Sequence, residues 1–475
     1  MNRWWIPTVI NRRGVALPLA LFALVMLSGL LLAFLTMSGM EPTIAANLSD
    51  ITRARYIGDA AVEWAYDRLA AAPLTGSGSW NDILAKGGTM ATNQAIPGVL
   101  GTFTVTMRND NQPVDNQITG LAACNAQGAT DCGPLLPTST NDNNFVVIVT
   151  ATGTLNGGTP NQVQRQIQVV VRRIGLPPLP GAVNFPGLQA DINPGGTAHL
   201  HVNGVDYNRN GSLGTGPLKF GYTVPSGINP ATGTTFEAQV ENNLTRHDKN
   251  EMTGRDQRKP CCVAIARGSD LNCPCEGEYS IVPQSVLPSN EQLTPQKIAD
   301  FISQVKAQIG GNTIKVNPAK PLVVNSGTSA DPSVPVNLGT VSKPTITYIQ
   351  GTPDPTDRYT SVALNGNTSG AGILILEDAD MAISGTFRWD GIILITGKNV
   401  GVTFKQGSRA FIYGGLVVDE TDKTERAGSY EMLIEANAHG DSSVDQFTTF
   451  YSSQQNLDMV QGIGSLVKVT TWREI

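Results

Sequence analysis

An unbroken apolar run dominates the start of the chain. From Gly14 to Met40 no residue is charged, and most residues are Leu, Ala, Val, Phe or Met. As a helix, about 26 residues extend roughly 39 Å, which is enough to cross a hydrocarbon core of about 30 Å with some tilt. A secretory signal peptide has a shorter apolar core, about 7–15 residues, followed by a small-residue cleavage site. The run therefore predicts a membrane-spanning helix.

The residues after this run keep a helical spacing. Pro42 is expected to kink the helix without necessarily ending it. Beyond it, apolar side chains recur three or four positions apart, which is typical of a helix with one buried face: Ile44, Leu48, Ile51, Ala54, Ile57, Ala61, Trp64, Ala65 and Leu69. We expect one long helix over residues 15–72, apolar in its first half and amphipathic in its second.

Three later segments alternate apolar and polar residues, as half-buried strands do. They are 101–110, 144–155 and 162–173, and the last two flank an Asn/Gly/Pro turn that predicts a hairpin. A small antiparallel sheet beside the long helix is therefore expected in a globular region over 73–175. A Pro-rich linker at 176–183 ends this region.

The remaining chain, 184–475, is predicted to be a mostly-β exported domain. One helix is expected from Pro295 to the glycine at 310. Between 372 and 418, strand-like segments recur about every ten residues, which favours a β-helix or β-solenoid with two strands per turn. An antiparallel meander in a sandwich is the alternative. The fold class is α+β.

Composition and charge agree with an exported β-rich chain. Only 15% of the 475 residues are charged, while there are 50 Gly and 29 Pro. The net charge of −6, without an extended basic patch, gives no sign of a nucleic-acid partner. Arg3, Arg12 and Arg13 precede the apolar run, so the N-terminus is expected in the cytoplasm and the bulk of the chain outside it.

Six cysteines are candidates for disulfides, since an exported chain meets an oxidising compartment. Cys124 and Cys132 are close enough in sequence to close a small loop. The other four lie within fifteen residues, and their spacing departs from the Cys-x₂-Cys pairs of common zinc sites, so two disulfides of open connectivity are favoured over zinc: Cys261, Cys262, Cys273 and Cys275.

The remaining candidate chemistry is sparse. Asp206, Asn208 and Asn210 match the start of a calcium loop, but its twelfth position is proline, so an Asn/Gly-rich turn is favoured over a Ca²⁺ site. His199 and His201 share a strand face without an evident third ligand. The carboxylates at 377–380 are a candidate for glycan chemistry, although solvated carboxylates at a turn are the favoured interpretation. Because no catalytic fingerprint appears, we expect no enzyme and no cofactor beyond possible Ca²⁺.

The N-terminal features resemble those of a known family. A short basic leader ending in Gly14 before a long apolar helix resembles a class III prepilin leader, and "RARYIGDAAVEWAYDRL" resembles the helix of PilX-type minor pilins and related GspK-type pseudopilins. The resemblance implies that a prepilin peptidase removes residues 1–14 by cutting between Gly14 and Val15. Major pilins carry glutamate at the fifth mature position; here it is Leu19, which matches the PilX and GspK subgroup.

The resemblance also implies a role. It indicates a structural minor pilin of a type IV pilus or secretion pseudopilus, near the filament tip, with other minor and major pilins, the prepilin peptidase and an inner-membrane assembly platform as partners. Before assembly the helix would lie in inner-membrane lipid as a single span, with the bulk periplasmic; later the protein would reach the pilus or cell surface. Two other functions are alternatives to the minor pilin: a pilus-associated or membrane-anchored adhesin, and an anchored glycan-active β-helix enzyme.

Overall fold

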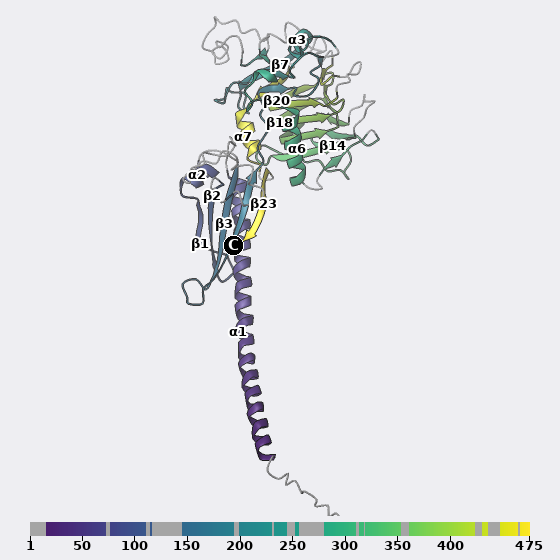
Figure 1. Ribbon diagram of the computed structural model, residues 1–475. Coiled ribbons are helices and arrows are strands. Elements are labelled where there is room, and N and C mark those ends of the chain that lie inside the picture. Colours follow the sequence, from purple (N-terminus) through teal and green to yellow (C-terminus); the bar gives the residue numbers. More distant parts are fainter. Residues whose placement is uncertain are drawn as a thin grey trace, which may run out of the picture.

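The computed structural model describes most of the chain. The described residues are 16–72, 77–110, 115, 145–193, 199–229, 232–244, 252–255, 280–309, 313–317, 319–352, 361–422, 430–435, 447–463 and 466–475. A long helix extends from a small sheet, and a larger β-rich body lies at the opposite end of that sheet (Figure 1). The expected α+β fold class is confirmed.

The long helix α1 spans Ala16–Ala71, 56 residues, and contains Pro42. This agrees with the single helix expected over 15–72. Its buried residues all lie in the second half and recur at helical spacing, which places them on one face: Ala54, Ile57, Gly58, Ala61, Ala65 and Leu69.

A five-stranded antiparallel sheet packs against this face of α1. Its order is β1-β2-β3-β4-β23, and the three predicted strands are β2, β3 and β4, with β3 and β4 forming the expected hairpin. The strands are β1 Thr89–Ala95, β2 Thr102–Asn109, β3 Val146–Leu155, β4 Val163–Arg173 and β23 Val467–Glu474. A short helix, α2 Trp80–Ala85, lies between α1 and β1.

The edge strand β23 comes from the end of the chain. It pairs antiparallel with β4, so Trp472 lies beside Val169. The last strand of the 184–475 region therefore belongs to the first sheet. The β-rich body, residues 181–463, is inserted between two neighbouring strands of that sheet.

The body contains two mainly parallel sheets. From β14 to β21, successive strands alternate between them, and each strand pairs in parallel with the next strand of its own sheet, as where Ile373 lies beside Ile392. An antiparallel meander is therefore wrong for these strands. The seven-stranded sheet has the order β13-β12-β15-β17-β19-β21-β6, with bounds β13 Thr328–Ser329, β12 Leu322–Asn325, β15 Val362–Asn365, β17 Met381–Ser384, β19 Val402–Phe404, β21 Met432–Ile434 and β6 Ile192–Asn193.

The eleven-stranded sheet is longer and branched. Its main path is β10-β8-β5-β20-β18-β16-β14-β11, and β22, β7 and β9 branch from β20. The bounds are β10 Ile281–Pro283, β8 Phe220–Val224, β5 Gly181–Asn184, β20 Arg409–Glu420, β18 Thr386–Gly397, β16 Thr368–Glu377, β14 Thr345–Gln350, β11 Ile314–Lys315, β22 Phe447–Ser452, β7 His199–Asp206 and β9 Met252–Thr253.

Apolar residues fill both faces of the eleven-stranded sheet. One face meets the second sheet in the main core, and the other is covered by α6 Pro295–Ile309 and α7 Gln454–Gln461. Burial on both faces is why the strands read as continuous apolar runs such as "GILILE" and "GIILITG". The helix α6 has the bounds that the sequence predicted. The remaining helices are α3 Phe236–Asn243 and the 3₁₀ helix η4 Gln284–Val286.

Candidate functional site

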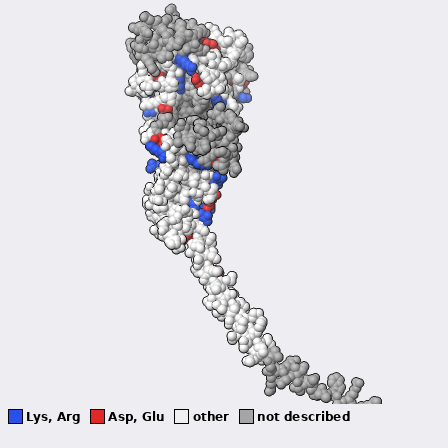
Figure 2. Space-filling model, turned by 60° about the vertical axis from the view of Figure 1, so that its left-hand side comes forward, with Lys and Arg blue, Asp and Glu red and all other residues white. Residues whose placement is uncertain are grey.

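The first half of α1 is the largest apolar surface of the described chain. Every large hydrophobic side chain from Leu17 to Leu48 is between 56% and 76% exposed. The helix extends away from the sheet, and the visible face of this stretch is almost entirely uncharged (Figure 2). By length and composition, α1 can cross a membrane. Such a surface needs a lipid or protein environment.

The second half of α1 is held close to the sheet by small residues. At the crossing with β3, a Cβ atom added to Gly153 would lie 2.2 Å from the carbonyl oxygen of Ala54 and 2.6 Å from the amide nitrogen of Gly58. A Cβ on Gly58 would lie 3.0 Å from a methyl group of Ile167. The backbones of helix and strand therefore approach more closely than a larger residue at Gly153 permits.

The C-terminal end of α1 is fixed by a buried arginine. Arg173, at the end of β4, donates from Nη2 to the carbonyl oxygens of Leu69 and Ala72, both at 2.9 Å. Its guanidinium lies 5.0 Å from the ring centre of Trp80, whose indole N–H also donates to Leu69. A cation at this position satisfies carbonyls that the helix leaves unpaired and interacts favourably with the helix dipole. The helix is thus joined to the sheet at its end as well as along its face.

The predicted processing site falls partly outside the described residues. Gly14 and Val15 precede the described residues, whereas Leu19 lies in the first turns of α1, is exposed, and has no acidic residue in the first turn beside it. Cleavage therefore stays a prediction. All six cysteines also fall outside the described residues, so their pairing stays a prediction too.

The candidate calcium loop forms bonds within the protein. The two carboxylate oxygens of Asp206 accept the backbone N–H groups of Gln454, at 2.6 Å, and Gly216, at 2.7 Å. Asn208 and Asn210 bond to residues of the same turn. Among the described residues, no three His, Cys, Asp or Glu side chains form a potential metal cluster. These bonds describe an ordered turn, and calcium binding stays a prediction.

Of the two paired histidines, the described side chain contacts an aromatic ring. His201 lies edge-on to Tyr451, with ring centres 5.7 Å apart. The side chain of His199 lies outside the described residues.

The carboxylates at 377–380 each bond to different partners within the protein. Glu377 forms an ion pair with Lys306 of α6 at 2.6 Å and also accepts from the hydroxyl of Tyr348, where burial raises the pKa of the phenol. Asp380 accepts the N–H of Gly401 at 3.0 Å, and Asp378 accepts that of Lys398 at 3.4 Å. Glycoside hydrolysis uses two carboxyl groups that flank a substrate space. These contacts instead join α6 and a neighbouring turn to the sheet.

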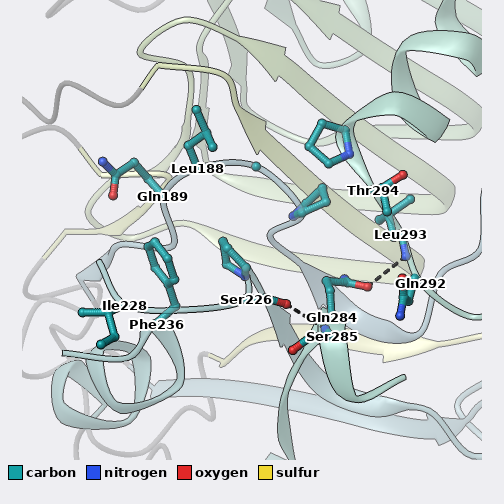
Figure 3. Close-up of a pocket in the computed structure, with 14 residues that line it drawn as sticks. Leu188, Gln189, Ser226, Ile228, Phe236, Gln284, Ser285, Gln292, Leu293 and Thr294 are labelled. Atoms are coloured by element: carbon teal, nitrogen blue, oxygen red, sulfur yellow. Dashed lines mark hydrogen bonds between the residues drawn. The ribbon is translucent and has the colours of Figure 1, made fainter. Parts of the chain in front are cut away.

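A pocket of about 650 Å³ in the body was not predicted from the sequence (Figure 3). Its walls come from the loops after β5, β8 and β10 and from the starts of α3 and α6. The described lining residues are Pro186, Gly187, Leu188, Gln189, Pro225, Ser226, Ile228, Phe236, Gln284, Ser285, Gln292, Leu293, Thr294 and Pro295. These segments are far apart in sequence, so only the strand pairing reveals that they meet.

Comparisons with known proteins give little further information. No family model matches the sequence, and no curated protein matches it. Among solved structures, the chain is similar to the competence-associated pilin ComZ from Thermus thermophilus, at 8% identity over 90% of this chain and 98% of that chain, with a TM-score of 0.22. A likeness at that TM-score carries no argument about function.

Proposed function

We propose that this protein is a structural, pilin-like subunit that takes part in the assembly of a type IV pilus or a related pseudopilus. The observation that carries the proposal is the division of α1. One continuous helix exposes an apolar first half and packs its second half against a small antiparallel sheet. A subunit needs such a helix if the exposed half lies first in a membrane and later packs among the helices of other subunits.

The hydrophobic free energy permits such a transfer. Burying one large aliphatic side chain stabilises by about 1.5–3 kcal/mol, so the apolar half of α1 contributes tens of kcal/mol in lipid or in a helix bundle. Both environments bury the same side chains, so moving from one to the other costs little hydrophobic free energy. The helix is therefore suited to exchange lipid neighbours for the helices of other pilins.

The body supports a position at the filament tip. It lies beyond the C-terminal end of α1, on the side of the sheet away from the exposed helix (Figure 1). In a filament of stacked subunits, this is where the next subunit would have to pack. Leu19, in place of the glutamate of major pilins, also supports a specialised subunit over one repeated along the filament.

This proposal includes the partners and location implied by the sequence. Removal of residues 1–14 by a prepilin peptidase would leave Val15 at the N-terminus. The subunit would span the inner membrane once, with the body periplasmic, before contacting the assembly platform and other pilins.

Labelling of assembled filaments tests the tip position. An antibody against the body, viewed by electron microscopy on sheared filaments, is expected to label filament ends. Label distributed along the filament would contradict a tip role, and absence of the protein from filaments would contradict the pilin role itself.

A further inference from the structure

The pocket in the body lies where three parallel strands end together. β5, β8 and β10 are adjacent and parallel, with Val183 beside Tyr222 and Tyr222 beside Ile281. The loops that leave their carboxyl ends form three of the pocket walls (Figure 3). Crevices at the carboxyl ends of parallel strands are where open sheets commonly bind ligands.

Hydrogen bonds between the walls fix their positions. Ser226 accepts the N–H of Ser285 at 2.7 Å, which ties the β8 loop to the β10 loop. Gln284 accepts the N–H of Leu293 at 2.8 Å, which ties the β10 loop to the segment before α6. These bonds hold the pocket walls in place, and the volume of about 650 Å³ is within the roughly 300–1,000 Å³ typical of small-ligand sites. Little ordering cost opposes binding.

The described lining of the pocket contains no ionisable side chain. The two charged residues of segment 284–297 are engaged elsewhere: Glu291 pairs with Arg255 at 2.9 Å, and the ammonium of Lys297 donates to the carbonyls of Ser289 and Gln292. A charged ligand would lose hydration without gaining a counter-charge. The geometry favours an uncharged ligand.

The lining combines two kinds of surface. Leu188, Ile228 and three prolines provide apolar area, while the Ser285 hydroxyl and the Gln292 amide provide hydrogen-bonding groups. One N–H of Gln292 donates to the carbonyl oxygen of Leu287 at 2.7 Å. Ile228 is 63% exposed at the rim. A ligand with many hydroxyl groups and apolar C–H faces matches this combination. An extended peptide is less suited, because the described lining residues follow β5, β8 and β10 and include no residue of these strands for main-chain pairing.

We propose that this pocket binds an uncharged saccharide. Display of the pocket at a filament end rests on the proposed pilin function. Saccharide binding by the pocket does not depend on that function. The proposal gives a binding site and a class of ligand to the alternative role of the protein as an adhesin.

Binding of the full-length protein in detergent to immobilised oligosaccharides tests the proposal. The panel contains uncharged chains of hexoses and N-acetylhexosamines, and the same chains ending in sialic or uronic acid. Ser285→Trp fills the pocket from an exposed lining position, and Val286→Trp places the same side chain next to it but outside the lining. We expect an uncharged chain to bind, with affinity reduced at least about tenfold by Ser285→Trp, equivalent to about 1.4 kcal/mol, and unchanged by Val286→Trp.

Three results would overturn the proposal: no binding of uncharged chains, binding of only the acidic chains with loss at high salt, or equal binding by the two variants. Thermal unfolding of each variant verifies that the body is folded. Peptidase processing of Ser285→Trp is expected to be normal. Failure of saccharide binding with normal processing would therefore reject the pocket and leave the pilin role standing.

Discussion

The two halves of α1 share one helix but occupy opposite environments. From Leu17 to Leu48 its large apolar side chains are exposed, whereas from Ala54 to Leu69 a narrow stripe of mostly small residues is buried against the sheet. The first half carries no charge on any side up to Met40, and the second half is apolar on one side only. A helix that is apolar all round needs an apolar environment on every side, and an amphipathic one needs a single partner. The sheet supplies that partner for the second half alone.

The largest effect is expected where the second half meets β3. Gly153→Val places a side chain against the backbone of Ala54 and should destabilise the helix and sheet by about 3 kcal/mol. Urea unfolding of the detergent-solubilised protein, followed by tryptophan fluorescence, measures it. Gly157→Val is the matched control, because a Cβ there would meet only a side-chain methyl at 3.5 Å. Equal stability of the two variants would show that the close helix crossing is not needed.

A charge in the uncharged run of α1 should reduce incorporation into filaments and leave the free energy of unfolding unchanged. Leu27→Arg puts an unpaired cation in the middle of the apolar run, at a cost of about 2.5 kcal/mol in lipid, while leaving contacts with the sheet unchanged. We expect incorporation into filaments to fall more than about tenfold, with unchanged urea unfolding. Leu48→Arg, also exposed but beyond the uncharged run, is the control. A loss of stability in Leu27→Arg without loss of incorporation would contradict the division of the helix.

The end of the second half provides a smaller test. Arg173→Met removes two hydrogen bonds from a buried cation to the last carbonyls of α1 and should destabilise by about 2 kcal/mol. Arg172→Met removes an exposed arginine one position earlier and should have little effect. If urea unfolding does not separate the two variants, Arg173 does not fix the helix end.

The smallest effect is expected at the surface of the second half. Arg55 is half exposed, lies 5.5 Å from the ring centre of Trp472, and forms a long ion pair with Glu474 at 3.9 Å. Arg55→Ala should destabilise by no more than about 0.5 kcal/mol, since solvent screens such contacts. The difference from the unsubstituted protein should shrink further at high salt. A loss comparable to that of Arg173→Met would show that β23 depends on this contact.

Local patterns predicted the elements well. The uncharged run and the helical spacing after it gave α1, alternation gave β2 to β4, and the apolar runs near Ile373 and Ile392 gave strands of a repeating array. In each case the spacing of apolar residues depends only on which face of that segment is buried, so the sequence of the segment is enough to predict the element.

Long-range pairing was not predictable in this way. β23 alternates apolar and polar residues only from Val467 to Thr470. Its Arg473 bonds to Gln168, 305 positions earlier, and nothing in either segment identifies the other. The pocket was missed for the same reason, because its walls come from the ends of strands that become neighbours only in the folded sheet. Its described lining residues also include no charged side chain of the kind that marks candidate chemistry in a sequence.

Processing by a prepilin peptidase tests the central claim most directly. The full-length protein is co-expressed with the enzyme, and its N-terminus is determined by mass spectrometry, with Gly14→Glu as the uncleavable control. A pilin-like subunit should lose residues 1–14 and begin at Val15, while the control remains intact. An unprocessed N-terminus in the presence of active peptidase would contradict the assignment of α1 as an assembly helix.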